Sequence, residues 1–168
     1  MADRLLRRVT RTGFGLDAHR LTEGRRLVLC GVEIPYEKGL LGHSDADAAL
    51  HALTDALLGA AALGDIGQMF PDTDEKYSGI SSLLLLKQAA ERVRAAGFEI
   101  VNCDVTIVCQ RPKLAPFIPE MRIRVAGCLG IEVSRVSVKA TTTELMGYEG
   151  RGEGISAHAA ATLEECLI

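Results

Sequence analysis

The sequence of 168 residues contains no tryptophan, and aromatic residues make up only 4% of it. Aliphatic side chains must therefore fill most of the core, and a hydrophobic content of 48% is sufficient for one domain. The longest aliphatic run, residues 83–86, is far shorter than the roughly 20 apolar residues of a membrane span. We expect a soluble protein with a short N-terminal tail, residues 1–10, and a single domain over residues 11–168. The basic opening residues precede no apolar segment or cleavage site of a secretory signal.

The sequence also lacks an excess of charge of one sign, because 19 Lys and Arg residues stand against 22 Asp and Glu residues. A formal net charge of −3 argues against nucleic acid as a partner, and nothing in the chain predicts a membrane partner. The five cysteines are odd in number and form no C-x-x-C pair. This favours buried free thiols in a reducing cytoplasm over a disulfide framework.

Hydrophobic patterning predicts an α+β fold. Residues 9–19 and 26–36 are rich in β-branched and aliphatic side chains, and Glu23-Gly24 between them suggests an antiparallel hairpin. The remaining expected elements are helices over 45–58, 81–96 and 118–129, strands over 98–110 and 133–141, a loop over 64–74 and an element of either type over 155–163. Leu84 is expected on the buried face of the second helix. This order predicts a mixed β-sheet with helices layered on one face.

Asp17 and His19 are the first candidate metal ligands. One residue separates them, so they lie on the same face of a strand. His51, from the first helix, would complete a set of one carboxylate and two imidazoles with a tetrahedral position left open, which is typical of catalytic zinc. Asp47 and Asp55, one turn before and after His51, are candidates to orient its ring. The alternatives are an aspartate that caps a turn and a histidine satisfied within the core.

Two further groups are candidate phosphate sites. Ser44 is placed to cap the first helix, with His43 before it, and the helix amides there favour an anion; the alternative for His43 is an ordinary exposed residue. Residues 141–144, three threonines and Glu144, end a strand with hydroxyl donors and a carboxylate that suits a hard cation. The glycine-rich residues 147–154 lack the lysine and hydroxyl of a nucleotide-binding P-loop, so that function is rejected.

Six segments together resemble the 2-C-methyl-D-erythritol 2,4-cyclodiphosphate synthases. They are Asp17-x-His19, residues 34–45, the helix through His51, residues 64–74, residues 139–144 and residues 150–154. The resemblance covers residues 12–163 in order. It implies an α+β homotrimer with active sites between neighbouring subunits, acting in the non-mevalonate route to isoprenoid precursors.

The resemblance also implies roles for individual residues. Asp17, His19 and His51 match zinc ligands, and Glu144 matches the ligand of a magnesium or manganese ion. His43 and Thr142 match residues that stabilise the transition state. The matched substrate contacts are Ser44, Asp65, Ile66 and Gly67 for the methylerythritol phosphate, Phe70, Pro71, Asp72, Thr73 and Asp74 in a mobile flap, and Cys109, Pro112, Lys113, Leu114, Ala115, Thr141 and Thr143 around cytidine. Tyr148 and Arg151 match the lining of a central trimer channel that takes isoprenoid diphosphates.

The implied reaction is an intramolecular phosphoryl transfer. The 2-phosphate of 4-diphosphocytidyl-2-C-methyl-D-erythritol 2-phosphate attacks the β-phosphorus of its own diphosphate and expels CMP. Positioning and charge neutralisation would then supply most of the rate, because the nucleophile is already an anion. The alternatives are a zinc phosphodiesterase that uses metal-bound water and gives a linear product, and a non-enzymatic trimer that binds isoprenoid diphosphates around a structural zinc.

Overall fold

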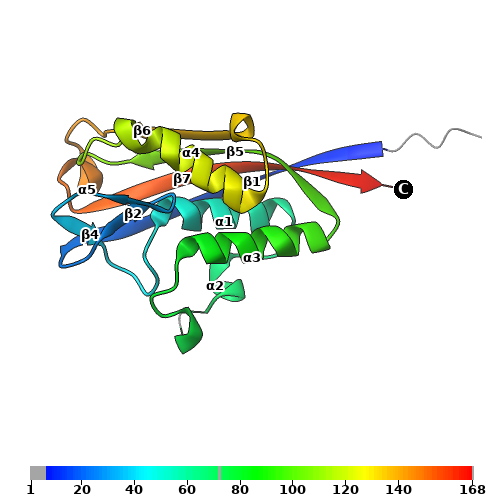
Figure 1. Cartoon of the computed structure of the whole chain (residues 1–168), viewed down its shortest axis with the longest axis horizontal. Helices are drawn as coiled ribbons and strands as arrows, with labels where there is room; N and C mark the ends of the chain where they lie inside the picture. The colour runs from blue at the N-terminus through cyan, green and yellow to red at the C-terminus, as the bar shows by residue number, and fades with distance from the viewer. Residues whose placement is uncertain (1–6, 72, 168) are drawn as a thin grey trace, which may run out of the picture.

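The computed structural model describes residues 7–71 and 73–167, and its centre is a five-stranded sheet in the order β4-β1-β7-β5-β6 (Figure 1). The strands are β1 (Arg7–Glu23), β4 (Lys38–Leu40), β5 (Phe98–Val108), β6 (Val136–Thr141) and β7 (Gly154–Leu167). β5 and β6 pair in parallel, and the other neighbours are antiparallel. The sheet is therefore mixed, as the order of elements predicts.

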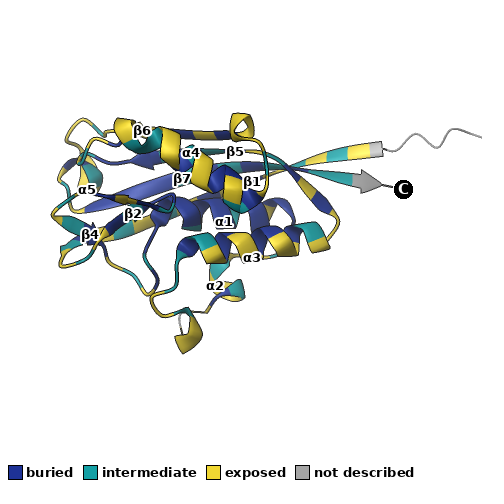
Figure 2. Ribbon diagram, viewed as in Figure 1, coloured by how far each residue is buried: buried dark blue, intermediate teal, exposed yellow. Residues whose placement is uncertain are grey.

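Three long helices cover this sheet: α1 (Ala48–Ala60), α3 (Ser82–Ala95) and α4 (Ile118–Leu129). α1 packs on β1 and β7, α4 packs on β6, and α3 lies against α1 and α4. Their outward sides are exposed, whereas the sides turned to the strands are buried (Figure 2). The shorter helical elements are α2 (Ile66–Met69), α5 (Gly147–Gly150) and the 3₁₀ turns Glu75–Tyr77, Ala115–Phe117 and Val133–Arg135. The predicted α+β class, with helices layered on one face, is confirmed.

The layer of α1 against β1 is unusually close because small residues line it. Gly13 and Gly15 lie on the strand face that is turned to the helix, and a Cβ on either would lie 2.0 Å from a helix carbonyl oxygen. Those carbonyls belong to Ala56 and Ala52, respectively. Only glycine leaves room for this approach, so the two positions determine how near α1 comes to the strand.

The predicted hairpin between residues 9–19 and 26–36 is wrong. β1 pairs instead with β7 along its length, from Arg7 opposite Leu167 to Arg20 opposite Gly154, and with β4 beyond that. The second segment folds on itself as β2 (Leu27–Leu29) and β3 (Val32–Ile34). The turn between them is Cys30-Gly31, with φ values of 50° and 73°. Two positive φ values in a two-residue loop match the twist of a hairpin, so the reversal occurs there and not at Gly24.

Several predicted boundaries also differ. Residues 7–10 of the expected tail belong to β1, and residues 1–6 lie outside the described part. The expected loop over 64–74 contains α2, and the expected strand over 133–141 begins with a 3₁₀ turn. Leu84 is 52% exposed, because α3 turns Leu85 and Leu86 to the core instead. The element over 155–163 is a strand.

The first helix begins later than predicted. Asp47, not Ser44, is the N-cap of α1, and its carboxylate accepts a hydrogen bond of 3.1 Å from the Leu50 amide. The same carboxylate accepts bonds from the amides of Cys30 (3.0 Å) and Gly31 (2.7 Å). Asp47 therefore joins the start of α1 to the β2–β3 turn. Burial raises the pKa of Asp47 to about 6, while these backbone bonds act in the opposite direction.

Four cysteines are free thiols in the described structure. Cys30, Cys103 and Cys109 are buried and Cys128 is partly buried, whereas the Cys166 side chain lies outside the described part. Burial raises the pKa of Cys103 to about 12 and those of Cys109 and Cys128 to about 11. Within residues 7–71 and 73–167, no helix combines the length and the apolarity that crossing a membrane requires.

Candidate metal centre and its pocket

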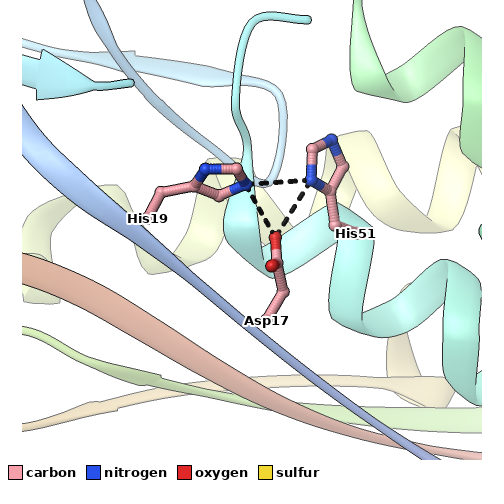
Figure 3. A group of neighbouring side chains, drawn as sticks. All are labelled: Asp17, His19 and His51. Carbon is pink, nitrogen blue, oxygen red and sulfur yellow. Dashed lines mark hydrogen bonds and ion pairs between the residues drawn. The ribbon is translucent and has the colours of Figure 1, made fainter. Parts of the chain in front are cut away.

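The three predicted ligands come from two elements that the glycine contact brings together. β1 alternates regularly, so Asp17 and His19 both face α1, and His51 projects from the first turn of that helix. The three side chains point toward one another (Figure 3). Each is mostly buried, with 26% of Asp17, 19% of His19 and 14% of His51 exposed. The predicted convergence of these residues is confirmed.

The ligand atoms form a nearly equilateral triangle. Asp17 Oδ2 lies 2.9 Å from His19 Nε2 and 3.0 Å from His51 Nδ1, and the two nitrogens are 3.3 Å apart. A tetrahedral zinc ion with bonds of about 2.0–2.1 Å holds its ligands about 3.3 Å apart. One carboxylate and two imidazoles are also a donor set that zinc prefers. The residues therefore fit such an ion, and no fourth His, Cys, Asp or Glu joins the group within the described residues.

The electrostatics of the triangle favour a cation. Burial opposes the ionisation of Asp17, but hydrogen bonds with His19 and His51 hold its pKa well below the usual range. The bond to Asp17 also raises the pKa of His19. A carboxylate that stays ionised in a half-buried site attracts positive charge, and it therefore favours the protonated form of its histidine neighbour as well as a bound cation.

The outer nitrogens of both imidazoles have partners. His19 Nδ1 lies 2.8 Å from the Leu41 carbonyl oxygen and can only donate to it. His51 Nε2 lies 2.9 Å from Ser82 Oγ and 3.1 Å from Ser44 Oγ. Such contacts orient metal-binding histidines. The prediction that Asp47 and Asp55 orient His51 is wrong, because Asp47 bonds the β2–β3 turn and Asp55 accepts the Ile66 amide at 2.7 Å.

A pocket of about 260 Å³ opens over the triangle. In addition to the three ligands, the predicted site residues that line this pocket are His43, Ser44, Ile66, Gly67 and Phe70. Gly42, Tyr77 and Leu85 complete it and were not predicted. Tyr77 packs edge-on against Phe70 at 5.3 Å between ring centroids.

A second pocket of about 240 Å³ lies at the end of β5 and β6. Its predicted lining residues are Cys109, Pro112, Lys113, Leu114, Ala115, Thr141 and Thr142. Beside it, Glu144 accepts a hydrogen bond of 2.6 Å from Thr142 Oγ1, and Thr143 bonds the Met146 carbonyl. Glu144 and Leu145 have φ values of 52° and 67°, a conformation that costs energy in non-glycine residues and is typical of functional loops.

The two pockets share no lining residue. Within one described chain, the metal triangle therefore lies in a different pocket from the one that Thr141 and Thr142 line.

Other predicted site residues have local partners. Asp65 caps α2 through the Gln68 amide, at 2.8 Å, and Asp74 caps the 3₁₀ turn that follows it. Pro71 and Thr73 are exposed beside them, and Asp72 lies outside the described residues. Tyr148 lines a separate hollow with His19, Arg20 and Glu153, and Arg151 pairs with Glu153 at 2.6 Å. None of these described residues lines the metal pocket or the second pocket.

Sequence reasoning missed Ser82 and Asp45 as neighbours of His51. Ser82 lies 31 residues after His51, and its hydroxyl bonds both the His51 ring and the Asp45 carboxylate. No local pattern indicates this contact, because it depends on where α3 begins relative to α1.

Comparison with known proteins agrees with this geometry. The sequence profile of the YgbB family matches residues 10–164. A 2-C-methyl-D-erythritol 2,4-cyclodiphosphate synthase from Syntrophomonas wolfei is 61% identical over 155 residues, which cover 92% of this chain and 99% of that protein. The Neisseria gonorrhoeae synthase is 59% identical, covering 91% and 96%. A solved synthase in its CDP-bound form superposes with a TM-score of 0.84 at 40% identity, covering 91% of this chain and 99% of that one.

Proposed function

Because the chain belongs to the YgbB family, whose curated relatives are 2-C-methyl-D-erythritol 2,4-cyclodiphosphate synthases, we propose that it catalyses this cyclisation in the non-mevalonate pathway. The substrate is 4-diphosphocytidyl-2-C-methyl-D-erythritol 2-phosphate. An oxygen of its 2-phosphate forms a bond to the β-phosphorus, the bond from that phosphorus to the CMP oxygen breaks, and CMP leaves with the electron pair. The products are the cyclic diphosphate and CMP.

The observation that carries this proposal is the triangle of Asp17, His19 and His51 at the base of a pocket. These three residues would hold a zinc ion and, as in catalytic zinc sites, would leave room for a substrate oxygen. When bound, zinc supplies Lewis-acid polarisation of the β-phosphate. His51 and His19 would hold the metal, with their rings oriented by Ser82, Ser44 and Leu41. Little acid-base chemistry is needed, because the attacking phosphate is already an anion.

The residues around the triangle position the sugar phosphate. His43 and Ser44 line one side of the pocket, and Ile66 and Gly67 at the start of α2 line another. We assign these residues and Asp65 to the methylerythritol phosphate, with His43 and Thr142 stabilising the charge that develops during transfer. Residues 70–74, which run between α2 and the following 3₁₀ turn, are the proposed flap.

The second pocket is the proposed cytidine site. Cys109, Pro112, Lys113, Leu114, Ala115, Thr141 and Thr143 are the residues assigned to it. The CDP-bound relative supports a cytidine diphosphate ligand. Glu144 is the proposed ligand of a magnesium or manganese ion. A single carboxylate fits such an ion only when substrate phosphates supply further oxygens, as is common for magnesium.

We propose a homotrimer in which the two pockets of neighbouring chains form one active site. Two observations support it: the metal triangle lines one hollow of the chain whereas Thr141 and Thr142 line another, and the sheet face opposite the helices carries exposed apolar side chains. Phe14 is 66% and Leu16 54% exposed on that face, and His158 packs beside Phe14 at 6.0 Å between ring centroids. Exposed apolar residues on a sheet face are typical of subunit contacts.

Tyr148 and Arg151 are assigned to a central channel of this trimer, with an isoprenoid diphosphate as its ligand. Arg20, which lines the same hollow as Tyr148 together with Glu153, is the residue that could pair with the diphosphate there. We place the enzyme in the cytoplasm, since free buried thiols suit a reducing compartment.

The test is to incubate the protein with the substrate, zinc and magnesium and to follow the ³¹P resonances. The proposal predicts equal amounts of CMP and the cyclic diphosphate. A zinc phosphodiesterase would release CMP with a linear product, and a non-enzymatic binding protein would leave the substrate unchanged; either result would overturn the proposal.

A further inference from the structure

The side chain that approaches the outer nitrogen of His51 most closely comes from α3, an element that supplies no metal ligand. Ser82 is the first residue of that helix, its side chain is buried, and its Oγ lies 2.9 Å from His51 Nε2. Its hydroxyl donates a hydrogen bond to the Asp45 carboxylate. His51, Ser82 and Asp45 therefore form a continuous chain of hydrogen bonds that ends in a charge.

The direction of this chain follows from the chemistry of its groups. A carboxylate only accepts hydrogen bonds, and a serine hydroxyl has one proton to donate. Because that proton is committed to Asp45, Ser82 Oγ meets the imidazole with its lone pairs. The His51 group that can donate a hydrogen bond to these lone pairs is an N–H on Nε2. With a proton on Nε2, Nδ1 can present its lone pair to a metal once the ion takes the place of the hydrogen that Nδ1 shares with Asp17 in the metal-free site, and this is the tautomer that ligates a metal.

Asp45 is itself held in place at the start of α3. Both of its oxygens lie 3.1 Å from the Ser82 amide nitrogen, and the Asp47 amide donates to one of them at 3.4 Å. Its own amide donates to the Ile80 carbonyl at 3.1 Å. The N-cap residue of α3, Ser81, makes no side-chain capping bond, so Asp45 takes the usual place of the cap.

Ser44 also contacts the His51 ring, but it does not select one tautomer. Its Oγ lies 3.1 Å from His51 Nε2 and accepts the Ala46 amide at 3.1 Å, but its proton is donated to no carboxylate among the described residues. Ser44 can therefore donate to Nε2 or accept from it. Of the two serines that contact the ring, only Ser82 distinguishes the metal-binding tautomer from the other.

We propose that Asp45 and Ser82 are positioning residues that hold His51 in its metal-binding tautomer and thereby set the affinity of the metal site. This inference rests on the assignment of Asp17, His19 and His51 as zinc ligands in the proposed function. Contacts of this kind contribute about 10- to 100-fold to metal affinity. The start of α3, which follows the flap in sequence, is consequently tied to the metal centre.

The test measures zinc binding to the folded full-length protein by competition with a chromophoric chelator. Ser82→Ala is expected to weaken zinc binding about 10- to 100-fold, and Ser82→Thr, which keeps the hydroxyl, is expected to restore most of it. Ser81→Ala is the matched control: it removes the neighbouring hydroxyl, which bonds neither the cap nor the imidazole, and should leave the affinity unchanged.

Asp45→Asn provides a second route if Ser82→Ala does not fold. The amide has one acceptor oxygen for the Ser82 and Asp47 donors, so the Ser82 proton is freed toward His51 and zinc affinity should fall. The d–d absorption of bound Co²⁺ should also change in intensity in both variants but not in Ser81→Ala. Equal zinc affinities and Co²⁺ spectra in Ser82→Ala and Ser81→Ala would overturn the proposal. These readouts need no substrate, so they stand or fall separately from the ³¹P product assay.

Discussion

Gly15 determines both the stability of the layer between β1 and α1 and the shape of the metal triangle. A Cβ at this position would lie 2.0 Å from the Ala52 carbonyl oxygen and 2.9 Å from the Ala56 amide nitrogen. Ala52 directly follows His51, and Asp17 lies two residues after Gly15. Gly15→Ala therefore forces β1 and α1 apart next to the residues that carry the metal ligands.

The size of the effect follows from the contact. A carbon and a carbonyl oxygen in contact are about 3.3–3.6 Å apart, so α1 must move by about 1.3 Å or more. Overpacking of this kind costs about 1–3 kcal/mol of unfolding free energy. The same shift exceeds the tolerance of about 0.2 Å in metal-ligand distances. We expect zinc affinity to fall by about 100-fold, the upper end of what positioning contacts contribute.

Thermal melting of the metal-free protein and zinc titration together check this. Gly59→Ala is the matched control on the same helix, because its Cβ meets nothing within 4 Å. It should stabilise the protein by about 0.5–1 kcal/mol and leave zinc binding unchanged. Gly13→Ala, whose Cβ meets Ala56 one turn further from His51, should destabilise comparably with a smaller loss of affinity. Wild-type melting and zinc affinity in Gly15→Ala would refute the close-contact reasoning.

Four further predictions follow from the site and the core. Zinc must displace a proton from His19, whose pKa is raised by Asp17, so affinity measured from pH 8 to 5 should fall about tenfold per unit below that pKa; a flat profile would contradict it. Glu144→Gln should leave the melting temperature unchanged but raise the magnesium needed for half-maximal activity. At a magnesium concentration too low for Glu144→Gln alone to act, mixed and re-assembled His51→Ala and Glu144→Gln chains should regain about a quarter of wild-type activity if sites lie between subunits, and none if each chain holds a whole site. Iodoacetamide at pH 8 should label Cys109 and Cys128 far more slowly in the native than in the urea-unfolded protein, because burial raises both pKa values to about 11.

The parts of the fold that depend on local periodicity could be predicted from the sequence. The spacing of Asp17 and His19 placed them on one face of a strand, and the pattern over 118–129 matches α4 residue for residue. Strand pairing could not be predicted, because alternation in β1 does not identify β7 as its partner, and the reversal at Cys30 lacks the usual Asn-Gly or Asp-Gly signal. The predicted start of α1 was wrong because the cap, Asp47, also accepts hydrogen bonds from the distant β2–β3 turn.

Some residues of the candidate site could likewise be predicted from the sequence, and others could not. Asp17, His19 and His51 can be identified from residue type and spacing, together with the family resemblance, because carboxylates and imidazoles are typical metal ligands. Ser82 and Asp45 are ordinary helix-start residues in the sequence, and their contact with His51 arises only when α3 packs beside α1. Asp47 and Asp55 have the right spacing for His51, but backbone amides elsewhere take their carboxylates.

The most direct test of the central claim is to run the reaction in H₂¹⁸O and to analyse the products by ³¹P resonance and mass spectrometry. If the substrate supplies its own nucleophile at the site formed by Asp17, His19 and His51, the cyclic diphosphate appears without ¹⁸O, together with an equal amount of CMP, and Asp17→Asn abolishes both. A linear diphosphate that carries one ¹⁸O atom would show that water is the nucleophile and would contradict the account.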